Sequence, residues 1–366
     1  MNDSFATSPL FERVERARRR KHKIRETHIT LAHGSGGRAM HDLVEGLFLE
    51  YFRNPLLEKL EDQAVFEVKA ASRMAFTTDS YVVDPIFFPG GDIGELAVHG
   101  TVNDLAMSGA RPLYLSAGFI LEEGFPIEDL RRVCASMQRA AEEAGVQIIT
   151  GDTKVVQRGG ADKIFINTAG IGVIETQANI SSQNARPGDK VIVSGTIGDH
   201  GTTIMISRGE LELETNIESD SASLHLLVAD IIGEAEKRGA IDGIHCLRDP
   251  TRGGVATTLN EIAMSSDVSI EIREDLIPVR ENVKGACEIL GLDPLYVANE
   301  GKLVAVVSGD IADAEIERMR QNPHGTVACI IGEVKAEPQG IVSMTTGFGG
   351  TRIVDMLAGE QLPRIC

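Results

Sequence analysis

The stretch MAFTTDSYVV at residues 74–83 decides the fold together with the two segments that follow it, DIGELAVHGTVNDLAMSGA at 92–110 and PLYLSAGFIL at 112–121. The first and third segments predict β-strands, and the middle segment has the apolar spacing of a helix that Gly109 closes. A strand, a helix and a second strand in succession are typical of an α/β unit.

Similar signals surround this unit. Residues 127–144 place their apolar residues on one face, which predicts a helix ended by Gly145. Two strands are predicted at 146–152 and 164–173. Upstream, THITLA predicts a short strand at 27–32, which runs into HGSGG (33–37) and then a helix from Arg38 to Phe52.

A length of 366 residues favours two domains. The segment NARPGDK (184–190) predicts a Pro/Gly turn, after which VIVSGTIG begins a new strand-turn-helix succession, so we expect the boundary near residue 180. We therefore divide the chain into a basic extension, an N-terminal domain, a C-terminal α/β domain and a flexible tail ending in Cys366. These are residues 1–26, 27–180, 181–340 and 341–366.

Composition and charge exclude several classes of function. A net charge of −18, only 4% aromatic residues and no Trp disfavour nucleic-acid binding, and the charge also disfavours an anionic membrane. Residues 1–26 are the exception, with eight Lys/Arg against four Asp/Glu, but no apolar signal region follows them. Five scattered cysteines without a CxxC pair argue against disulfides or a cysteine zinc site, and we expect a reducing cytoplasm.

No GxxxxGK[ST] motif is present, which excludes a P-loop. HGSGGRA at 33–39 fits the dinucleotide fingerprint GxGxx[G/A], but no acidic strand end follows about 20 residues on, so we discount a Rossmann role. A tight turn, or a flexible loop whose amides cover phosphates, are the readings that remain.

Four aspartates stand at predicted strand ends or helix faces: Asp79, Asp104, Asp152 and Asp249. Each alone fits an Asx-turn or a helix cap. Their joint pattern favours a Mg²⁺ site for nucleotide phosphates, because Mg²⁺ takes one or two carboxylates with phosphate and water oxygens.

Three further segments carry candidate site residues. In RDPTRGG (248–254) a glycine pair opens a helix, where free amides favour an anion, although an ordinary helix entry is the alternative. Lys154 places a cation beside Asp152 and either holds a phosphate or reacting group or pairs with a surface acid. Asn299 and Glu300 are predicted in a turn before a strand.

The chain ends in Cys366, too late for a prenylation box, and its own carboxylate opposes thiolate formation. A terminal cysteine is commonly inert. Pro363 favours the alternative, because it stiffens the tail and reduces the entropy lost when the thiol enters a pocket.

Together these motifs resemble the HypE carbamoyl dehydratases, within the superfamily of aminoimidazole ribonucleotide synthetase and selenophosphate synthetase. The resemblance runs from His28 to Cys366 through LAHGSGG, TTDSYVVDPIFFPGGDIGELAVHGTVNDLAMSGARPLYLS, TGDTKVV, RDPTRGGVATTLNEIA, ANEGKL and the terminal PRIC. The terminal PRIC discriminates this family from the rest of the superfamily. The basic extension lies outside the pattern.

The resemblance implies a two-domain α/β fold with mixed and antiparallel sheets, an N-terminal domain that binds ATP and forms a homodimer, and nucleotide bound between domains and across the dimer. It implies that HypF delivers a carbamoyl group to Cys366, that ATP with Mg²⁺ drives its dehydration to a thiocyanate, and that the cyanide passes to iron on the HypC–HypD complex during NiFe hydrogenase maturation.

The resemblance also implies roles for residues. Cys366 and Lys154 would be catalytic, and Asp79, Asp104 and Asp249 would hold the metal. The nucleotide-contacting set would be Asn103, Asp104, Asp152, Thr153, Gly253, Gly254 and Glu300. The base that removes the amide protons has no assignment from the sequence.

Three rival functions stay open at this point. A selenophosphate synthetase-like kinase would need a reactive Cys and Lys in the glycine-rich region, and HGSGG has neither. A silent scaffold conflicts with the aspartate pattern. A dehydrogenase would rest on HGSGG alone.

Overall fold

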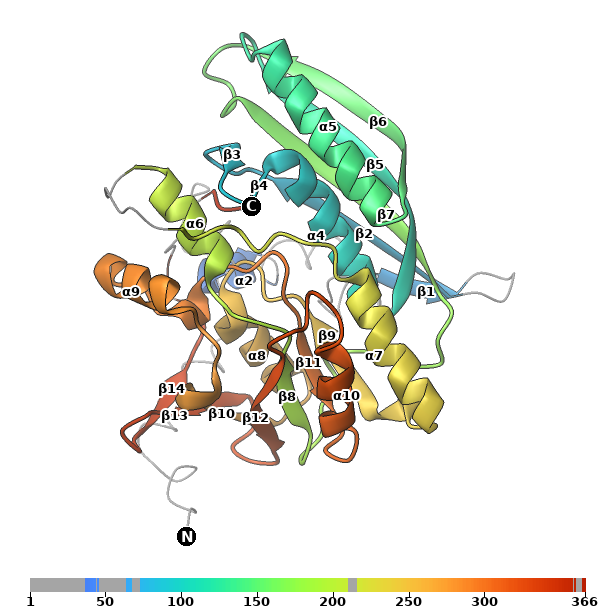
Figure 1. Ribbon diagram of the computed structural model, residues 1–366, viewed down its shortest axis with the longest axis vertical. Helices are drawn as coiled ribbons and strands as arrows, with labels where there is room; N and C mark the ends of the chain where they lie inside the picture. Colours follow the sequence, from blue (N-terminus) through green and yellow to red (C-terminus); the bar gives the residue numbers. More distant parts are fainter. Residues whose placement is uncertain are drawn as a thin grey trace.

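The structure, a computed structural model, describes residues 37–43, 45, 64–67, 73–209, 216–357, 359 and 364–366. The described residues of its first half form one five-stranded sheet, one small hairpin and three helices (Figure 1). In chain order these are α2 (Arg38–Leu43), β1 (Ala64–Glu67), β2 (Arg73–Tyr81), β3 (Phe87–Phe88), β4 (Gly91–Asp92), α4 (Ile93–Met107), β5 (Ala110–Glu122), α5 (Ile127–Glu143), β6 (Gln147–Val156) and β7 (Ile164–Ile174).

The second half contains a seven-stranded sheet with its helices. Its elements are β8 (Lys190–Val193), α6 (Asp199–Ser207), α7 (His225–Arg238), β9 (Ile244–Arg248), α8 (Gly254–Ser265), β10 (Ser269–Arg273), α9 (Glu281–Leu290), β11 (Val304–Val307), α10 (Ala312–Met319), β12 (Cys329–Lys335), β13 (Ile341–Thr345) and β14 (Thr351–Val354).

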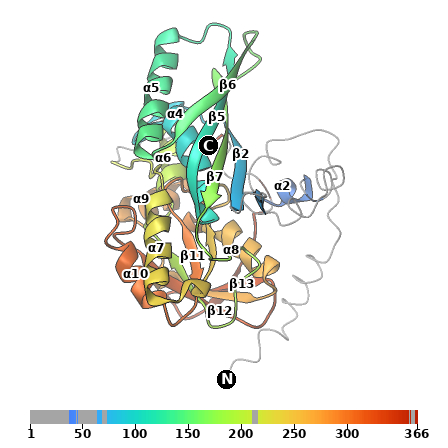
Figure 2. The same ribbon diagram turned by 90° about the vertical axis from the view of Figure 1, so that its right-hand side faces the viewer.

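The first sheet has the order β1-β2-β7-β5-β6, with only β5 and β6 parallel. Figure 2 shows α4 and α5 on one side of this sheet. The strands alternate accordingly: in β7 every second residue from Ile164 is buried. The strands and helices predicted between residues 74 and 173 are confirmed within a few residues at each end.

The second sheet has the order β14-β13-β10-β12-β8-β11-β9, with β10 and β13 parallel and the other pairs antiparallel. Strand β11, which lies between β8 and the edge strand β9, is buried on both faces: Val304 and Val306 pack in the core under α8, and Ala305 and Val307 pack in the core with α7 and α10. Because both faces of this strand are covered, its sequence is the continuous apolar run VAVV and does not alternate with polar residues. The predicted mixed, two-part α/β architecture is thus confirmed.

Helix α4 lies between the two halves of the molecule and is buried along almost its whole length. Asp92 caps its first turn by accepting hydrogen bonds from the amides of Gly94 and Glu95. Gly109, with φ of 74°, follows its last turn as predicted. The helix therefore contributes side chains to the cores of both halves.

The structure differs from the sequence expectation in the C-terminal tail. The first half of the expected tail forms β13 and β14, whose glycine-containing turn at residues 346–350 lies within the sheet as a hairpin. The strand predicted at 27–32 lies outside the described residues, and of the helix predicted from Arg38 to Phe52 only α2 is described.

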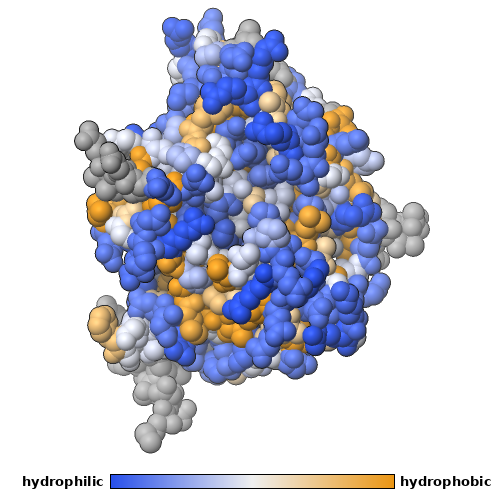
Figure 3. All heavy atoms as spheres, in the orientation of Figure 1, coloured by the Kyte–Doolittle hydropathy of each residue, from blue (hydrophilic) through white to orange (hydrophobic). Residues whose placement is uncertain are grey.

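Hydrophilic side chains dominate the face of the molecule in Figure 3, as the net charge of −18 requires. None of the helices in the described ranges has the length and apolar composition to cross a membrane.

Candidate active site

The end of the chain returns to the middle of the molecule. The amide of Val82 donates to an oxygen of the terminal carboxylate of Cys366 at 3.0 Å, and the amide of Asp84 donates to the carbonyl oxygen of Arg364 at 3.2 Å. This spacing is that of a short β-type pairing between residues 82–84, which continue β2, and residues 364–366. Figure 1 shows the C-terminus between α6 and the β3–β4 hairpin.

The thiol of Cys366 lies in a charged environment. Burial raises the pKa of this thiol well above its usual range, Arg252 acts in the opposite direction, and Glu300 and Asp79 raise it further. The thiol also forms a hydrogen bond with the Glu300 carboxyl group. Because a high pKa keeps the sulfur protonated, the docked thiol is a weak nucleophile.

Around this thiol stand more buried carboxyl groups than cations. Burial raises the pKa of Asp249 to about 6, and Asp79 adds to this rise. Burial likewise raises the pKa of Asp79, while Arg252 lowers it, and it raises the pKa of Glu300 well above its usual range. One oxygen of Glu300, Oε1, is buried without a hydrogen-bond partner. The negative charge of these carboxyl groups exceeds the positive charge beside them, so the cluster favours binding of protons or of a cation.

The buried side chain of Tyr81 lies near several of these carboxyl groups. It is 1% exposed, and burial raises the pKa of the phenol, followed by the charges of Asp79, Asp104 and Glu300. Asp104 accepts a hydrogen bond of 2.7 Å from the hydroxyl of Thr77 on β2. The phenol of Tyr81 is thus close enough to Asp79 and Asp104 of the first half, and to Glu300 of the second half, for their charges to affect its pKa.

The donor set is compatible with Mg²⁺. Among the described residues no three His, Cys, Asp or Glu side chains come together as a complete metal site. Mg²⁺ needs only one or two carboxylates when phosphate and water supply the other oxygens. Asp79 is close enough to Asp249 to raise its proton affinity, and the hard oxygen donors of both fit such an ion.

The predicted glycine pair stands at the start of α8. Gly253 precedes the helix with φ of 80°, and Gly254 follows with φ of 60°. A Cβ atom on Gly254 would lie 2.5 Å from the carbonyl oxygen of Leu295, so only glycine fits there. The helix has no side-chain cap, and the amide of Gly254 donates to the carbonyl oxygen of Thr251 at 2.9 Å.

The side chains of Asn103 and Asn299 form hydrogen bonds to the backbone of neighbouring segments. The Asn103 amide donates to the carbonyl oxygen of Ala222 at 2.9 Å and accepts from the amide of Leu224 at 2.7 Å. Asn299 is fully buried, accepts from the amide of Gly198 and donates to the carbonyl oxygen of Pro250. Both side chains therefore hold backbone around the site in place.

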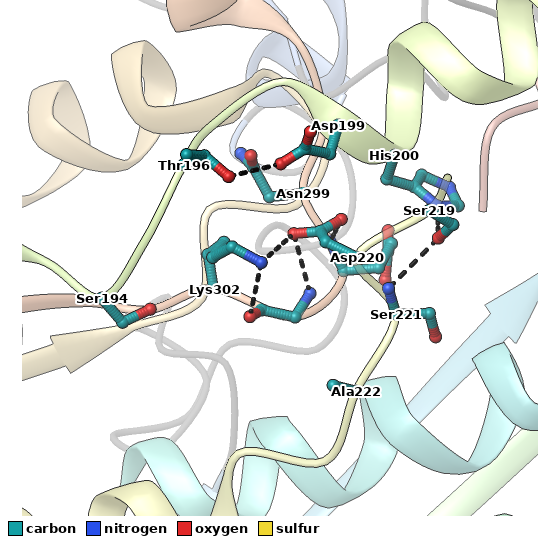
Figure 4. Close-up of polar contacts among 12 residues, drawn as sticks. Ser194, Thr196, Asp199, His200, Ser219, Asp220, Ser221, Ala222, Asn299 and Lys302 are labelled. Carbon is teal, nitrogen blue, oxygen red and sulfur yellow. Dashed lines mark hydrogen bonds and ion pairs between the residues drawn. The ribbon is translucent and has the colours of Figure 1, made fainter. Parts of the chain in front are cut away.

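Asp220 holds the segment that carries Glu300. Its carboxylate accepts from the amides of Glu300 (3.1 Å) and Gly301 (3.3 Å) and pairs with the ammonium of Lys302 at 3.0 Å (Figure 4). Asp220 is 2% exposed. Its negative charge also raises the pKa of Glu300, after the larger effect of burial.

Asp152 and Lys154 lie elsewhere. They form an ion pair of 2.6 Å on the edge strand β6, with side chains 69% and 68% exposed. Sheet register pairs Asp152 with Gly118 and Lys154 with Ile120, and β6 is three strand spacings, or about 14 Å, from β2.

The pair shares its sheet face with apolar side chains. Strand alternation places Asp152 and Lys154 on the face opposite α4 and α5, which also carries Phe76, Tyr114 and Ile120 at 42–44% exposure. The chain therefore does not bring Lys154 and Asp152 to Cys366 by itself. Thr153 lies between them on β6, and its side chain is outside the described part of the chain.

Three residues of the site were missed by the sequence reasoning: Arg252, Tyr81 and Asp220. Arg252 lies inside the motif RDPTRGG and was findable there, because a cluster of carboxylates needs a cation. Tyr81 reads as an ordinary strand residue. Asp220 stands in the segment before α7, where no motif marks it.

Comparison with known proteins gives the family. The AIR synthase related protein N-terminal domain matches residues 60–174, and the corresponding C-terminal domain matches 186–345. The carbamoyl dehydratase HypE of Bradyrhizobium diazoefficiens is 56% identical over 351 residues, which cover 96% of this chain and 100% of that relative. 

Solved structures agree. A HypE–HypF complex contains a chain that is 50% identical, with a TM-score of 0.80 and coverage of 86% of this chain and 99% of that one. HypE in complex with ATP is 53% identical, with a TM-score of 0.76 and coverage of 92% and 100%. The chain that folds its last cysteine back among these carboxylates therefore belongs to the HypE carbamoyl dehydratases, the hydrogenase maturation proteins of the AIR synthase superfamily.

Proposed function

We propose that this chain uses ATP to dehydrate a carbamoyl group carried on its own Cys366, forming a thiocyanate that supplies the cyanide ligand for NiFe hydrogenase. The observation that carries the proposal is the position of the Cys366 thiol, hydrogen-bonded to Glu300 and beside Arg252 and Asp79. ATP use is supported by the relative solved in complex with ATP.

The reaction balances in two steps. The carbamoyl oxygen attacks the γ-phosphorus of ATP, so that a new P–O bond forms, ADP leaves and one N–H proton is lost. The C–O bond then breaks, the second N–H proton leaves, and the nitrogen lone pair completes the C≡N bond. Phosphate leaves with the oxygen. Phosphorylation is required because an amide oxygen is a poor leaving group.

Glu300 is our candidate for the base that removes the N–H protons. Its carboxyl group already contacts the sulfur that would carry the carbamoyl group, and burial raises its pKa, which strengthens it as a proton acceptor. Arg252 would stabilise negative charge on the transferring phosphoryl group. The start of α8, where Gly253 precedes the helix and Gly254 is held by the carbonyl oxygen of Thr251, would place a phosphate at the positive end of the helix dipole.

The metal would be Mg²⁺, held by Asp79 and Asp249 with Asp104, and when bound it would neutralise charge on the nucleotide phosphates. Asn103 would act by holding the segment of Glu300, to whose carbonyl oxygen its amide donates at 3.4 Å.

Asp152, Thr153 and Lys154 would act from a second copy. Their sheet face carries exposed Phe76, Tyr114 and Ile120, an apolar surface that a homodimer would cover. Pairing two such faces would bring the Asp152–Lys154 pair of one protomer toward the site of its partner. Lys154 would then stabilise the developing charge on the carbamoyl oxygen or phosphate.

The partners follow from the chemistry. The carbamoyl group must come from a carbamoyltransferase, for which HypF is supported by the relative solved in a HypE–HypF complex. The cyanide would pass to iron on a HypC–HypD complex. We propose the reducing cytoplasm as the setting, because Cys366 must stay a free thiol and all five cysteines are free.

Intact mass spectrometry tests the proposal. The chain is incubated with HypF, carbamoyl phosphate and ATP, beside Cys366→Ala. We expect a carbamoyl adduct that Mg-ATP converts to a species lighter by one water and that the variant does not form. Glu300→Gln should accumulate the adduct without converting it. An adduct on any other residue, or none while HypF is active, would refute the assignment of Cys366.

A further inference from the structure

Two side chains of α6 bind the backbone of the chain's last residues. His200, in the first turn of the helix, contacts the carbonyl oxygen of Ile365 through Nε2 at 2.9 Å. Arg208, directly after the last residue of α6, donates through Nη2 to the carbonyl oxygen of Arg364 at 2.7 Å. The two contacts fall on consecutive carbonyls immediately before Cys366.

The hydrogen bonds behind His200 fix its tautomer. A carbonyl oxygen only accepts, so Nε2 carries the proton, and Nδ1 must accept from the hydroxyl of Ser219 at 2.8 Å. The Ser219 oxygen in turn accepts from the amide of Ser221 at 3.1 Å (Figure 4). The ring is fully buried, and the edge of Phe88 faces it with centroids 5.6 Å apart. Burial lowers the pKa of this imidazole, so the ring is neutral and is held in one orientation with its N–H donor toward the tail.

The side chain of Arg208 bridges the two paired segments, residues 82–84 and residues 364–366. Its Nε donates to the carbonyl oxygen of Asp84 at 2.9 Å while Nη2 donates to that of Arg364. One planar guanidinium thus spans residues 82–84 and 364–366, on top of the two amide contacts between them. The side chain of Arg364 points to Asp162 instead, at 2.7 Å.

The buried side chain of the docked end belongs to Ile365, which is 3% exposed in the core that α4 and α6 share. The buried side chain of Ile365 anchors the end of the chain, but an apolar contact does not set the backbone dihedral angles of that residue. The carbonyl contacts do set them, and with them the direction in which the next side chain, Cys366, points.

We infer that His200 and Arg208 are positioning residues that clamp the carbonyls of Ile365 and Arg364 and thereby hold the Cys366 sulfur at Glu300. Neither side chain contacts the reacting atoms. The inference deepens the proposed function, because the clamp would present the modified sulfur to the site, but docking itself needs neither ATP nor a carbamoyl group.

Losing one clamp contact should shift the balance between docked and undocked tail. A buried hydrogen bond of this kind is worth about tenfold in such an equilibrium, which corresponds to about 1.4 kcal/mol. Cys366 is partly exposed when docked, but its raised pKa keeps the docked thiol protonated and therefore slow to react. The undocked form should react faster with an alkylating agent, and the observed rate should follow its population.

The test is pulsed alkylation of the full-length protein with iodoacetamide, read for each cysteine by peptide mass spectrometry. We compare wild type, His200→Ala, His200→Gln and Arg208→Ala. The alanine variants should raise the rate at Cys366 about tenfold, and His200→Gln, whose amide can still donate, should restore most of the protection. Arg238→Ala serves as the matched control, because Arg238 pairs with Glu234 on α7 and does not touch the tail.

The other cysteines report on the fold. Cys134 is exposed, whereas Cys246 and Cys287 are buried, and Cys287 contacts Thr202 on α6. Their rates should not change. Unchanged alkylation of Cys366 in both alanine variants would overturn the inference. If His200→Ala also unmasks Cys246 and Cys287, its fold is disturbed, and Arg208→Ala with His200→Gln decide the question.

A second measurement separates the clamp from the chemistry. In protein carbamoylated at Cys366, the alanine variants should convert the adduct more slowly at saturating ATP, with the KM for ATP unchanged. Should the wild type form no thiocyanate at all, the proposed function fails while the alkylation result still decides the clamp.

Discussion

Glu315 offers a sharp test of the physical reasoning. Its side chain in α10 is fully buried and neither carboxyl oxygen has a hydrogen-bond partner. Burial raises its pKa from 4.5 to about 8, with a further rise from Glu234 that Arg238 partly offsets. Since the folded pKa lies above the unfolded one, the unfolded chain releases this proton first as the pH rises. Stability is therefore lost between about pH 4.5 and pH 8.

The magnitude follows from the two pKa values. At 1.36 kcal/mol for each pKa unit, Glu315 costs about 1 kcal/mol at pH 5 and about 3 kcal/mol at pH 7. Glu315→Gln keeps the shape and polarity of the protonated acid and removes this cost. The difference in free energy of unfolding between Glu315→Gln and the wild type should therefore grow by about 2.5 kcal/mol, in favour of the variant, from pH 5 to pH 7.

Urea unfolding followed by circular dichroism, at both pH values, measures this gain as a difference between the two proteins, so that other titrating groups cancel. Glu317→Gln, on the exposed side of the same helix, is the control and should show no comparable change with pH. A stability gap between Glu315→Gln and wild type that is the same at pH 5 and pH 7 would refute the reasoning.

Three further predictions concern the site. Mg-ATP should stabilise the wild type against thermal unfolding by about 2.7 kcal/mol at a ligand concentration of 100 times Kd. Asp249→Asn, or removal of Mg²⁺ with EDTA, should abolish this stabilisation. Calorimetry that shows equal stabilisation of variant and wild type would contradict the metal assignment. Ile120→Lys should halve the mass found by light scattering, whereas Ile289→Lys, equally exposed or more on α9, should not; a variant that stays dimeric excludes this face. Lys154→Met should stop conversion of the carbamoylated protein without changing alkylation of Cys366, and retained conversion would remove Lys154 from the mechanism.

Local pattern predicted the elements of the first half well. The strand and helix signals between residues 74 and 121 are confirmed in β2, α4 and β5. The two strands largely alternate buried and more exposed residues, and α4 is a long apolar segment that is buried on almost all sides and ends before Gly109. The tail was harder. Residues 347–350 hold three glycines, which we took for a mobile segment, but glycines there make the turn between β13 and β14. The better signal was the apolar run of β13, in which four consecutive residues, 341–344, are buried.

The site shows the same division. Asp79, Asp249, Glu300 and Cys366 were all chosen from the sequence, and the structure brings them into one charged environment. Lys154 was chosen by its spacing from Asp152, and that spacing holds, but sheet register decides which face and which edge the pair occupies. Register depends on long-range pairing, which no local motif encodes.

The position of α4 has a consequence for how the chain can be divided. Met107 at its end packs with Ile192 and Leu224, and Val98 on its flank belongs to a core that includes Ile204 and Val297. Two family domains meet in this molecule, yet they share their interiors. A gene split near residue 180 would therefore yield fragments with torn apolar surfaces that aggregate singly, and co-expression, not mixing of purified halves, would be the way to recover the protein.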